Sequence, residues 1–352
     1  MPASRAEGVI FAYDCPASRA ARRQGEIEHC PGGYRNVPGH VSGKGLGQKR
    51  KHKGLFTGAC IGTSRKMVDQ PAPPIIFDPR RRVLARDRAH VGFAAHDFLY
   101  RHMLEGLLER LGDVSRPLET VLLLGCPDTS ARDALRALGK SVTCCDPGAL
   151  NARANDGVQA DEDALPFASD SFDLVLSCDT LDTVNDLPGA LVLIRRLLRP
   201  DGLFLGACMG AGSLPRLKQA LLAAEGDKAR PHVHPQIDVR AAGDLLARAG
   251  YAMPVADIET LTVRYGSLLA LMRDLRGMGH GNVMARDRIG PLTRGAIARA
   301  SLLFGESADA DGRIGESFSI LYFSGWKPDP SQPLPARRGS ARVSLADVLK
   351  PG

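Results

Sequence analysis

The chain has 352 residues, of which 44% are hydrophobic, and it carries a formal net charge of +7 at pH 7. This length and composition predict a globular protein with one large α/β domain plus extensions, or with two smaller domains. No stretch approaches the roughly 20 apolar residues of a membrane helix, and no secretory signal opens the chain, so we expect a cytoplasmic protein.

The excess positive charge lies in residues 1–66, which hold 12 Lys and Arg against 4 Asp and Glu. That net of +8 leaves −1 for the other 286 residues, because the whole chain carries +7. The folded part therefore has no excess charge to attract nucleic acid, and we expect no nucleic-acid partner. Residues 1–66 are rich in Gly and Pro and lack any period, which predicts a disordered basic tail. The tail could be a basic arm, a targeting segment or a gene-start artefact with translation beginning at Met67.

The eight cysteines include no C-x-x-C pair, and several lie in apolar, strand-like runs. This pattern indicates small buried hydrophobic side chains rather than a disulfide framework. His232 and His234 stand two apart without a matching acid or cysteine nearby, so we expect no metal site.

Residues 67–115 predict an N-terminal helical segment, with apolar residues at helical spacing between Val83 and Leu111. Strands and helices then alternate up to residue 213. The predicted strands are 119–126, 141–146, 171–179 and 202–210, with helices at 130–139 and 186–200 between them. Such alternation predicts a mostly parallel sheet with helices on both faces.

The order loosens after residue 213. We expect helices at 214–225 and 239–251, a strand at 252–265, a helical insertion at about 266–305 and a last strand at 317–328. These elements complete a domain over residues 116–328, and residues 329–352 predict a surface tail. The glycine-rich residues 276–282 lie inside the insertion, where they either line a pocket or connect two helices.

Ligands bind beyond the carboxyl ends of the strands in an open parallel sheet. The first such loop contains Gly125 and Cys126, where a glycine lets the backbone approach a ligand, and Asp128, which we expect to cap the next helix. Asp146 ends the next strand about 20 residues on, where a carboxylate accepts hydrogen bonds from both hydroxyls of a ribose. Asp146 has a second interpretation as a turn residue before Pro147.

Two later stretches reach the same edge. Asp161 and Glu162 are placed to accept a hydrogen bond from an adenine amino group, or they form a solvated acidic turn. After the strand at 171–179, Asp179 and Asp182 point to acid–base chemistry or to helix capping, and both interpretations stay open. We assign no catalytic residue.

The stretch "FDLVLSCDTLDTVNDLPGALVLIRRLLRPDGLFLGA" resembles the centre of class I S-adenosylmethionine-dependent methyltransferases. The stretches "FDPRRRVLARDRA", "PHVHPQIDVRAAGDLLARAGY", "YGSLLALMRDLRGMGHGN" and "PARRGSARVSL" are similar to one sub-branch, a complex I assembly factor that acts as a protein arginine hydroxylase. A more distant similarity is to the malonyl-ACP methyltransferase of biotin synthesis.

The resemblance implies a Rossmann-like, seven-stranded sheet whose last strand is antiparallel. It implies that S-adenosylmethionine binds along this edge, with Gly125 and Cys126 in the loop and Asp146 on the ribose. Asp161 and Glu162 would border the adenine, and Ser177 would lie near the methionine end. It also implies a protein substrate, with a complex I subunit as the candidate.

The cofactor loop departs from the family pattern of acid-x-Gly-x-Gly-x-Gly. The acid position holds Leu123, and the later glycines are replaced by Pro127 and Thr129, so side chains occupy space that the cofactor would cross. Three hypotheses remain: a methyltransferase-like enzyme, a non-catalytic assembly factor, and a nicotinamide-dependent oxidoreductase. The third lacks its own glycine fingerprint.

Overall fold

A computed structural model describes residues 75–286 and 290–332. Within this range seven strands form one sheet in the order β3-β2-β1-β4-β5-β7-β6. The strands are β1 (Thr120–Leu124), β2 (Ser141–Asp146), β3 (Val158–Gln159), β4 (Phe172–Cys178), β5 (Leu198–Met209), β6 (Ala252–Tyr265) and β7 (Ile314–Trp326). Pairing is parallel from β3 to β5, whereas β7 runs antiparallel to both of its neighbours. This is the class I methyltransferase topology, so the predicted fold class is confirmed.

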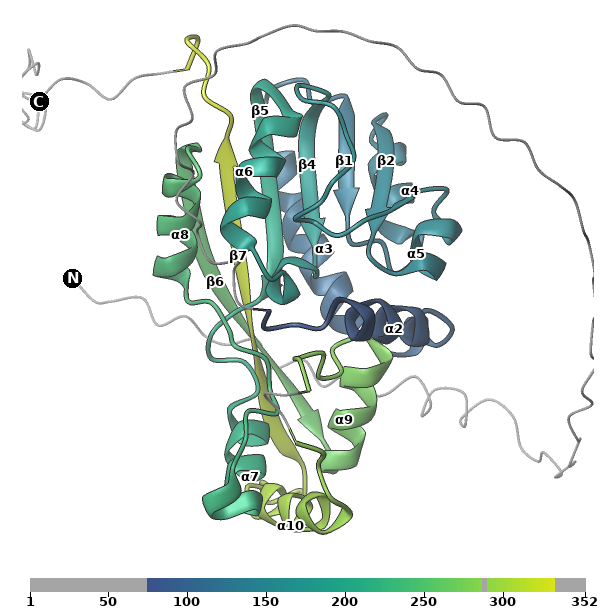
Figure 1. Ribbon diagram of the computed structural model, residues 1–352, viewed down its shortest axis with the longest axis vertical. Helices are drawn as coiled ribbons and strands as arrows, with labels where there is room; N and C mark the ends of the chain where they lie inside the picture. Colours follow the sequence, from purple (N-terminus) through teal and green to yellow (C-terminus); the bar gives the residue numbers. More distant parts are fainter. Residues whose placement is uncertain (1–74, 287–289, 333–352) are drawn as a thin grey trace, which may run out of the picture. The chain divides into compact units, whose positions relative to one another are not determined.

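Helices cover both faces of the sheet (Figure 1). They are α2 (Pro79–His90), α3 (Phe98–Gly112), α4 (Ser130–Ala137), α5 (Ala149–Ala154), α6 (Leu187–Leu197), α7 (Pro215–Glu225), α8 (Val239–Arg248), α9 (Leu268–Gly277) and α10 (Arg294–Gly305). Successive residues of β1 point to opposite faces, so that Val121 and Leu123 join the core that contains α3, while Leu122 and Leu124 join the core that contains α6 and α8. This two-sided burial explains the uninterrupted apolar run of β1.

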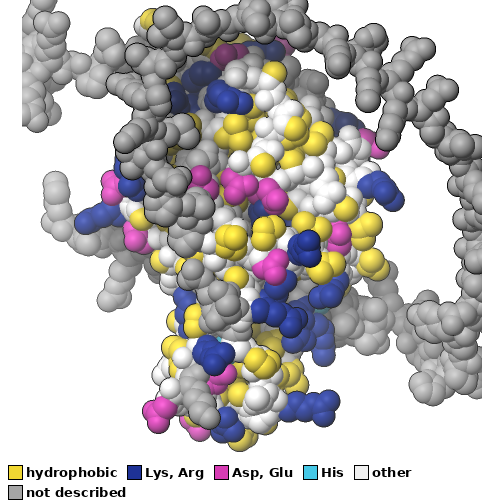
Figure 2. All heavy atoms as spheres, viewed as in Figure 1, with side chains coloured by type: hydrophobic (Ala, Val, Ile, Leu, Met, Phe, Trp, Pro, Cys, Tyr) yellow, Lys and Arg dark blue, Asp and Glu magenta, His cyan; other side chains and the backbone are white. Residues whose placement is uncertain are grey.

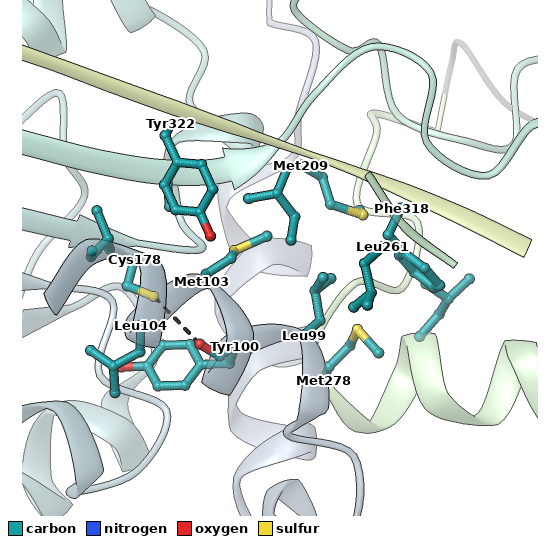
Figure 3. Close-up of a cluster of buried hydrophobic side chains, with 14 of the residues drawn as sticks. Leu99, Tyr100, Met103, Leu104, Cys178, Met209, Leu261, Met278, Phe318 and Tyr322 are labelled. Atoms are coloured by element: carbon teal, nitrogen blue, oxygen red, sulfur yellow. Dashed lines mark hydrogen bonds between the residues drawn. The ribbon is translucent and has the colours of Figure 1, made fainter. Parts of the chain in front are cut away.

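The strands β6 and β7 extend well past the other strands and carry α7, α9 and α10 at their far end (Figure 1). The core on the α3 face continues into this extension. Figure 3 shows Leu99 and Met103 of α3 in one cluster with Met209 of β5 and Phe318 of β7. One continuous apolar core therefore joins the sheet to the extension.

Two expected helical stretches are interrupted in the structure. The helical pattern between Val83 and Leu111 forms α2 and α3, separated by a short turn around Gly92. The two helices differ in environment, because α2 is polar and lies across the strand ends while α3 is apolar and packs on the sheet face. The insertion predicted at about 266–305 consists of α9 and α10 with a non-helical connection. The predicted tail at 1–66 and residues 333–352 lie outside the described residues.

Candidate functional site

The loop after β1 turns sharply at Gly125, whose φ is +82°. A Cβ atom at this position would overlap the carbonyl oxygen of Cys178 at the end of β4. The Tyr100 hydroxyl of α3 donates to the Gly125 carbonyl at 3.1 Å. The left-handed conformation and the close approach to β4 both require glycine. Gly125 therefore packs this loop against β4, and its role beside a cofactor stays a prediction.

Asp128 lies one residue before Thr129, the N-cap residue of α4, and contacts the start of this helix. Its Oδ1 accepts the backbone N–H of Ser130 at 3.0 Å, and its Oδ2 accepts from Arg101 at 2.9 Å. The carboxylate therefore satisfies a backbone donor that the first turn of the helix leaves unpaired.

Asp146 ends β2 and is fully buried. Its Oδ2 accepts from the backbone N–H of Cys126 at 2.8 Å and from Nη2 of Arg86 at 2.7 Å. Its Oδ1 accepts from Arg86 Nε at 2.9 Å, the Gly148 N–H at 2.7 Å and Asn151 Nδ2 at 3.2 Å. Burial alone would raise the pKa of Asp146, but the Arg86 guanidinium outweighs it, so the pKa is lowered and the carboxylate is charged.

The second acidic stretch is also paired with an arginine. Nη1 of Arg82 lies 2.9 Å from Asp161 Oδ1 and 2.7 Å from Glu162 Oε2. Nη2 of Arg82 donates to the carbonyl and hydroxyl oxygens of Thr180 at 2.8 and 2.9 Å, and Thr180 in turn donates to Glu162. Arg82 and Glu162 are both almost completely buried, whereas Asp161 is partly exposed.

Both arginines come from α2, four residues apart and therefore on one face of the helix. Asp78 caps the helix by accepting from the N–H groups of Arg80 and Arg81. Figure 1 shows α2 lying across the carboxyl ends of the strands. The helix thus brings two guanidinium groups to the edge where the sequence predicts a nucleoside.

This arrangement does not fit the nucleoside that the resemblance implies. A ribose would need acceptor positions on Asp146, yet five donors already converge on this fully buried carboxylate. The acids predicted beside the adenine, Asp161 and Glu162, are paired with Arg82. The carboxylates that the resemblance assigns to a nucleoside are thus paired with arginines of the chain itself.

Ser177 lies next to the end of β4 and is fully buried. Its hydroxyl has no hydrogen-bond partner among the described residues. A buried hydroxyl without a partner is uncommon in folded proteins. Its predicted place near the methionine end of the cofactor stays a prediction.

A second cluster lies beside the arginines, where Asp179 and Asp182 flank His280. Nε2 of His280 lies 2.7 Å from Asp179 Oδ2, and Nδ1 lies 3.8 Å from Asp182 Oδ2. Burial lowers the pKa of His280, but Asp179 and Asp182 outweigh it and raise the value to about 9. His280 is therefore a cation at neutral pH. Burial raises the pKa of Asp182, with His280 opposing the shift.

Asp179 is strained as well as buried. Its φ is +58°, its side chain is 5% exposed, and its Oδ1 has no hydrogen-bond partner among the residues that the structure covers. A left-handed backbone at a non-glycine residue costs free energy and is often found at functional sites. Asp179 therefore combines strain, burial and an unused acceptor at the end of a central strand.

A small cavity opens next to this cluster, between β5, α7 and the residues after α9. It is lined by the polar side chains Asp182, His232, His234, Gln236, His280 and Asn282, and by the apolar side chains Met209, Leu214, Leu217, Val233 and Leu275, together with Pro235. Nε2 of His234 accepts the N–H of Val283 at 3.0 Å, and burial lowers the pKa of His234 to about 3. His234 is thus neutral, and over residues 75–286 and 290–332 no metal-binding group of three or more His, Cys, Asp or Glu is found.

The structure brings together Gly125, Cys126, Asp146 and Ser177 at the ends of β1, β2 and β4, and it adds residues that the sequence analysis missed. The missed residues are Arg82, Arg86 and His280. The four-residue spacing of the two arginines was a visible signal, because it places both on one helical face. His280 lies in the glycine-rich stretch 276–282, but the local sequence does not indicate which side chains His280 contacts.

A family model described as "Methyltransferase domain" matches residues 122–206. The zebrafish (Danio rerio) protein "Arginine-hydroxylase NDUFAF5, mitochondrial" is 38% identical over 294 residues, which cover 79% of this chain and 90% of the relative. The human protein of the same name is 35% identical over 268 residues, covering 72% and 77%. "Malonyl-[acyl-carrier protein] O-methyltransferase" of Methylovorus sp. (strain MP688) is 30% identical over 298 residues, covering 80% and 96%.

These matches agree with the sheet order, with the antiparallel β7 and with the resemblance drawn from the sequence motifs. The alignment with the zebrafish relative covers most of both chains, whereas the methyltransferase domain model covers residues 122–206. The protein therefore belongs to the family of methyltransferase-like proteins that includes the NDUFAF5 arginine hydroxylases.

Proposed function

We propose that this protein acts on an arginine side chain of a protein partner, and that the partner is a subunit of respiratory complex I. The name of the relatives that are 34–38% identical, arginine-hydroxylase, supports arginine as the target. The charge balance of the candidate site supports the same residue type.

The edge of the sheet carries more acids than cations. The carboxylates are Asp146, Asp161, Glu162, Asp179 and Asp182, and the cations are Arg82, Arg86 and protonated His280. Five carboxylates against three cations leave a formal excess of two negative charges, or of one if Asp182 is protonated. Because most of these groups are buried, one further cation would be favoured there.

The observation that carries the proposal is the unused Oδ1 of Asp179. This oxygen is buried and has no donor among the described residues, and Asp179, Asp182 and His280 line a second small cavity together. A guanidinium presents several N–H donors in one plane and pairs well with a carboxylate. The same edge already holds two guanidinium groups of the chain itself. In this proposal Asp179 and Asp182 receive the substrate guanidinium, and His280 is a positioning residue that orients both carboxylates.

The negative excess argues against a malonyl carrier substrate, because a malonyl group brings its own carboxylate. The filled acceptor positions of Asp146 favour the second candidate function, a non-catalytic assembly factor. That candidate binds the same partner but leaves its arginine unmodified.

S-adenosylmethionine remains the proposed cofactor of the enzyme, with Gly125, Cys126, Asp146, Asp161, Glu162 and Ser177 as its proposed contacts. Within residues 75–286 and 290–332, every helix is too short or too polar to span a bilayer. The relatives are named as mitochondrial, and a cytoplasmic location stays a prediction.

Mass spectrometry of complex I subunits tests the proposal. Subunits are purified from the native strain, from a deletion strain and from strains that carry Asp179→Asn or Asp244→Asn, where Asp244 is an exposed residue of α8. We expect an arginine that gains one oxygen or one methyl group in the native and Asp244→Asn strains and loses it in the other two. An identical set of modified arginines in all strains would refute the enzymatic proposal, and reduced complex I in the deletion strain would then favour the assembly factor.

A further inference from the structure

We propose that α2 is a displaceable strap whose arginines bind the carboxylates of the nucleoside site, so that strap docking and nucleoside binding exclude each other. "Strap" here means Pro79–His90, with Arg82 and Arg86 as its ion-pair contacts to the edge. The inference rests on the nucleoside site of the proposed function. It does not depend on the arginine-binding role of Asp179.

The geometry of Arg86 supports competition for the same atoms. Its Nε and Nη2 reach the two oxygens of Asp146 at 2.9 and 2.7 Å, which is a two-pronged donor pair. The two neighbouring hydroxyls of a ribose form the same kind of donor pair. The backbone donors of Cys126 and Gly148 approach Asp146 independently of α2, so they stay in place when Arg86 leaves.

Arg82 closes the neighbouring part of the site. It donates to Asp161 and lies 2.7 Å from Glu162 Oε2, the acids proposed to border the adenine. A single helix therefore covers both ends of the proposed nucleoside site. Its two arginines occupy the two acidic groups, Asp146 and the pair Asp161 and Glu162, that a bound nucleoside would contact.

Charge rather than apolar packing holds the strap. The buried residues of α2 are Arg82 and Ala89, while Leu84 is 49% exposed. Basic side chains also gather on this part of the surface, as Figure 2 shows. An element with few buried apolar contacts can open locally at a fraction of the free energy of global unfolding.

Both ends of the strap are anchored outside the nucleoside site. Before it, Phe77 packs with Val283 and Met284, and Asn185 bonds the backbone of Phe77. After it, Phe93 joins the main core. The strap can therefore leave the edge while the chain stays attached on either side.

The test is calorimetric titration of the full chain with S-adenosylhomocysteine, a stable product form of the cofactor. We compare the native protein with Arg86→Gln, with Arg82→Gln/Arg86→Gln and with Arg88→Gln, a control on the exposed side of the same helix. We expect Arg86→Gln to bind at least about tenfold more tightly than the native protein, because the competitor is weakened. Arg88→Gln should match the native protein, and Asp146→Asn should abolish binding.

Hydrogen exchange on the native protein tests the strap without any substitution. We expect saturating S-adenosylhomocysteine to speed amide exchange in residues 79–90 and leave the core strands unchanged. Protection of α2 by the ligand would overturn the inference, because α2 would then be a lid over the ligand. Unchanged or weaker binding by a folded Arg86→Gln variant, or binding by neither protein, would overturn it as well.

Discussion

The role of Gly125 can be measured by comparing Gly125→Ala with Gly139→Ala. Both glycines have positive φ, +82° and +76°, but a Cβ at Gly139 meets nothing within 4 Å, whereas at Gly125 it overlaps the Cys178 carbonyl. An alanine in the left-handed conformation costs about 1–2 kcal/mol. The stiffer unfolded chain returns about 0.4–1 kcal/mol of this. Gly139→Ala should therefore lower the free energy of unfolding by about 0.5–1 kcal/mol.

Gly125→Ala carries the same backbone cost and adds the clash with β4. Relieving such an overlap requires a backbone shift worth about 1–3 kcal/mol, so the total loss should reach about 2–4 kcal/mol. Urea denaturation followed by circular dichroism gives both values, with equal m-values as the check on two-state behaviour. Equal losses for the two variants would refute the assignment of Gly125 to loop packing against β4.

Three further predictions concern the charged groups. His280 has an unfolded pKa near 6.5 and a folded pKa of about 9. Its contribution to the free energy of unfolding is therefore complete below about pH 6.5 and is lost as the pH rises through 9. Urea unfolding across this range should show that the free energy of unfolding falls more steeply for the native protein than for His280→Gln. Glu316 is buried and accepts the N–H of Leu217 at 2.8 Å. Glu316→Ala should therefore lower the free energy of unfolding in urea by about 1–3 kcal/mol and speed hydrogen exchange at the start of α7. Unchanged exchange there would contradict the assignment of Glu316 to the start of this helix. Because buried ion pairs hold α2, Arg86→Gln should speed exchange in residues 79–90 more than in α3, and a uniform response would argue against charge as the holding force.

The fold was predictable from local patterns. The apolar run of β1 and the alternation of strands with helices predicted a parallel sheet buried on both faces, and β1 lies inside the sheet between β2 and β4. The short β3 was missed, because Val158–Gln159 has too few residues to show a period. The helical segment predicted over residues 67–115 contains two helices, α2 and α3, and spacing alone does not reveal where the chain passes from the edge of a sheet to its face.

The pairing at the candidate site was not predictable in the same way. Asp146 and Arg86 are 60 residues apart in the chain, and Arg82 is 79 residues from Asp161. Nothing in the local sequence distinguishes arginines that face solvent from arginines buried against carboxylates. Their spacing gives a shared helical face, but only the tertiary structure shows which groups that face meets.

The altered cofactor loop and the strap both lower the affinity that we expect for a nucleoside. The backbone groups of Gly125 and Cys126 are satisfied within the protein, since Gly125 N–H donates to the Cys145 carbonyl and the Cys126 carbonyl accepts from Asn155. A ribose therefore gains little from this loop and must exchange its hydroxyl donors for those of Arg86 on Asp146. If docking of the strap is worth about 2–3 kcal/mol, the open form is a minor population and the apparent affinity falls by roughly 30- to 150-fold. A native protein with weak affinity and an Arg86→Gln variant that binds up to about 30- to 150-fold more tightly would then reflect one competition, rather than the loss of a nucleoside site.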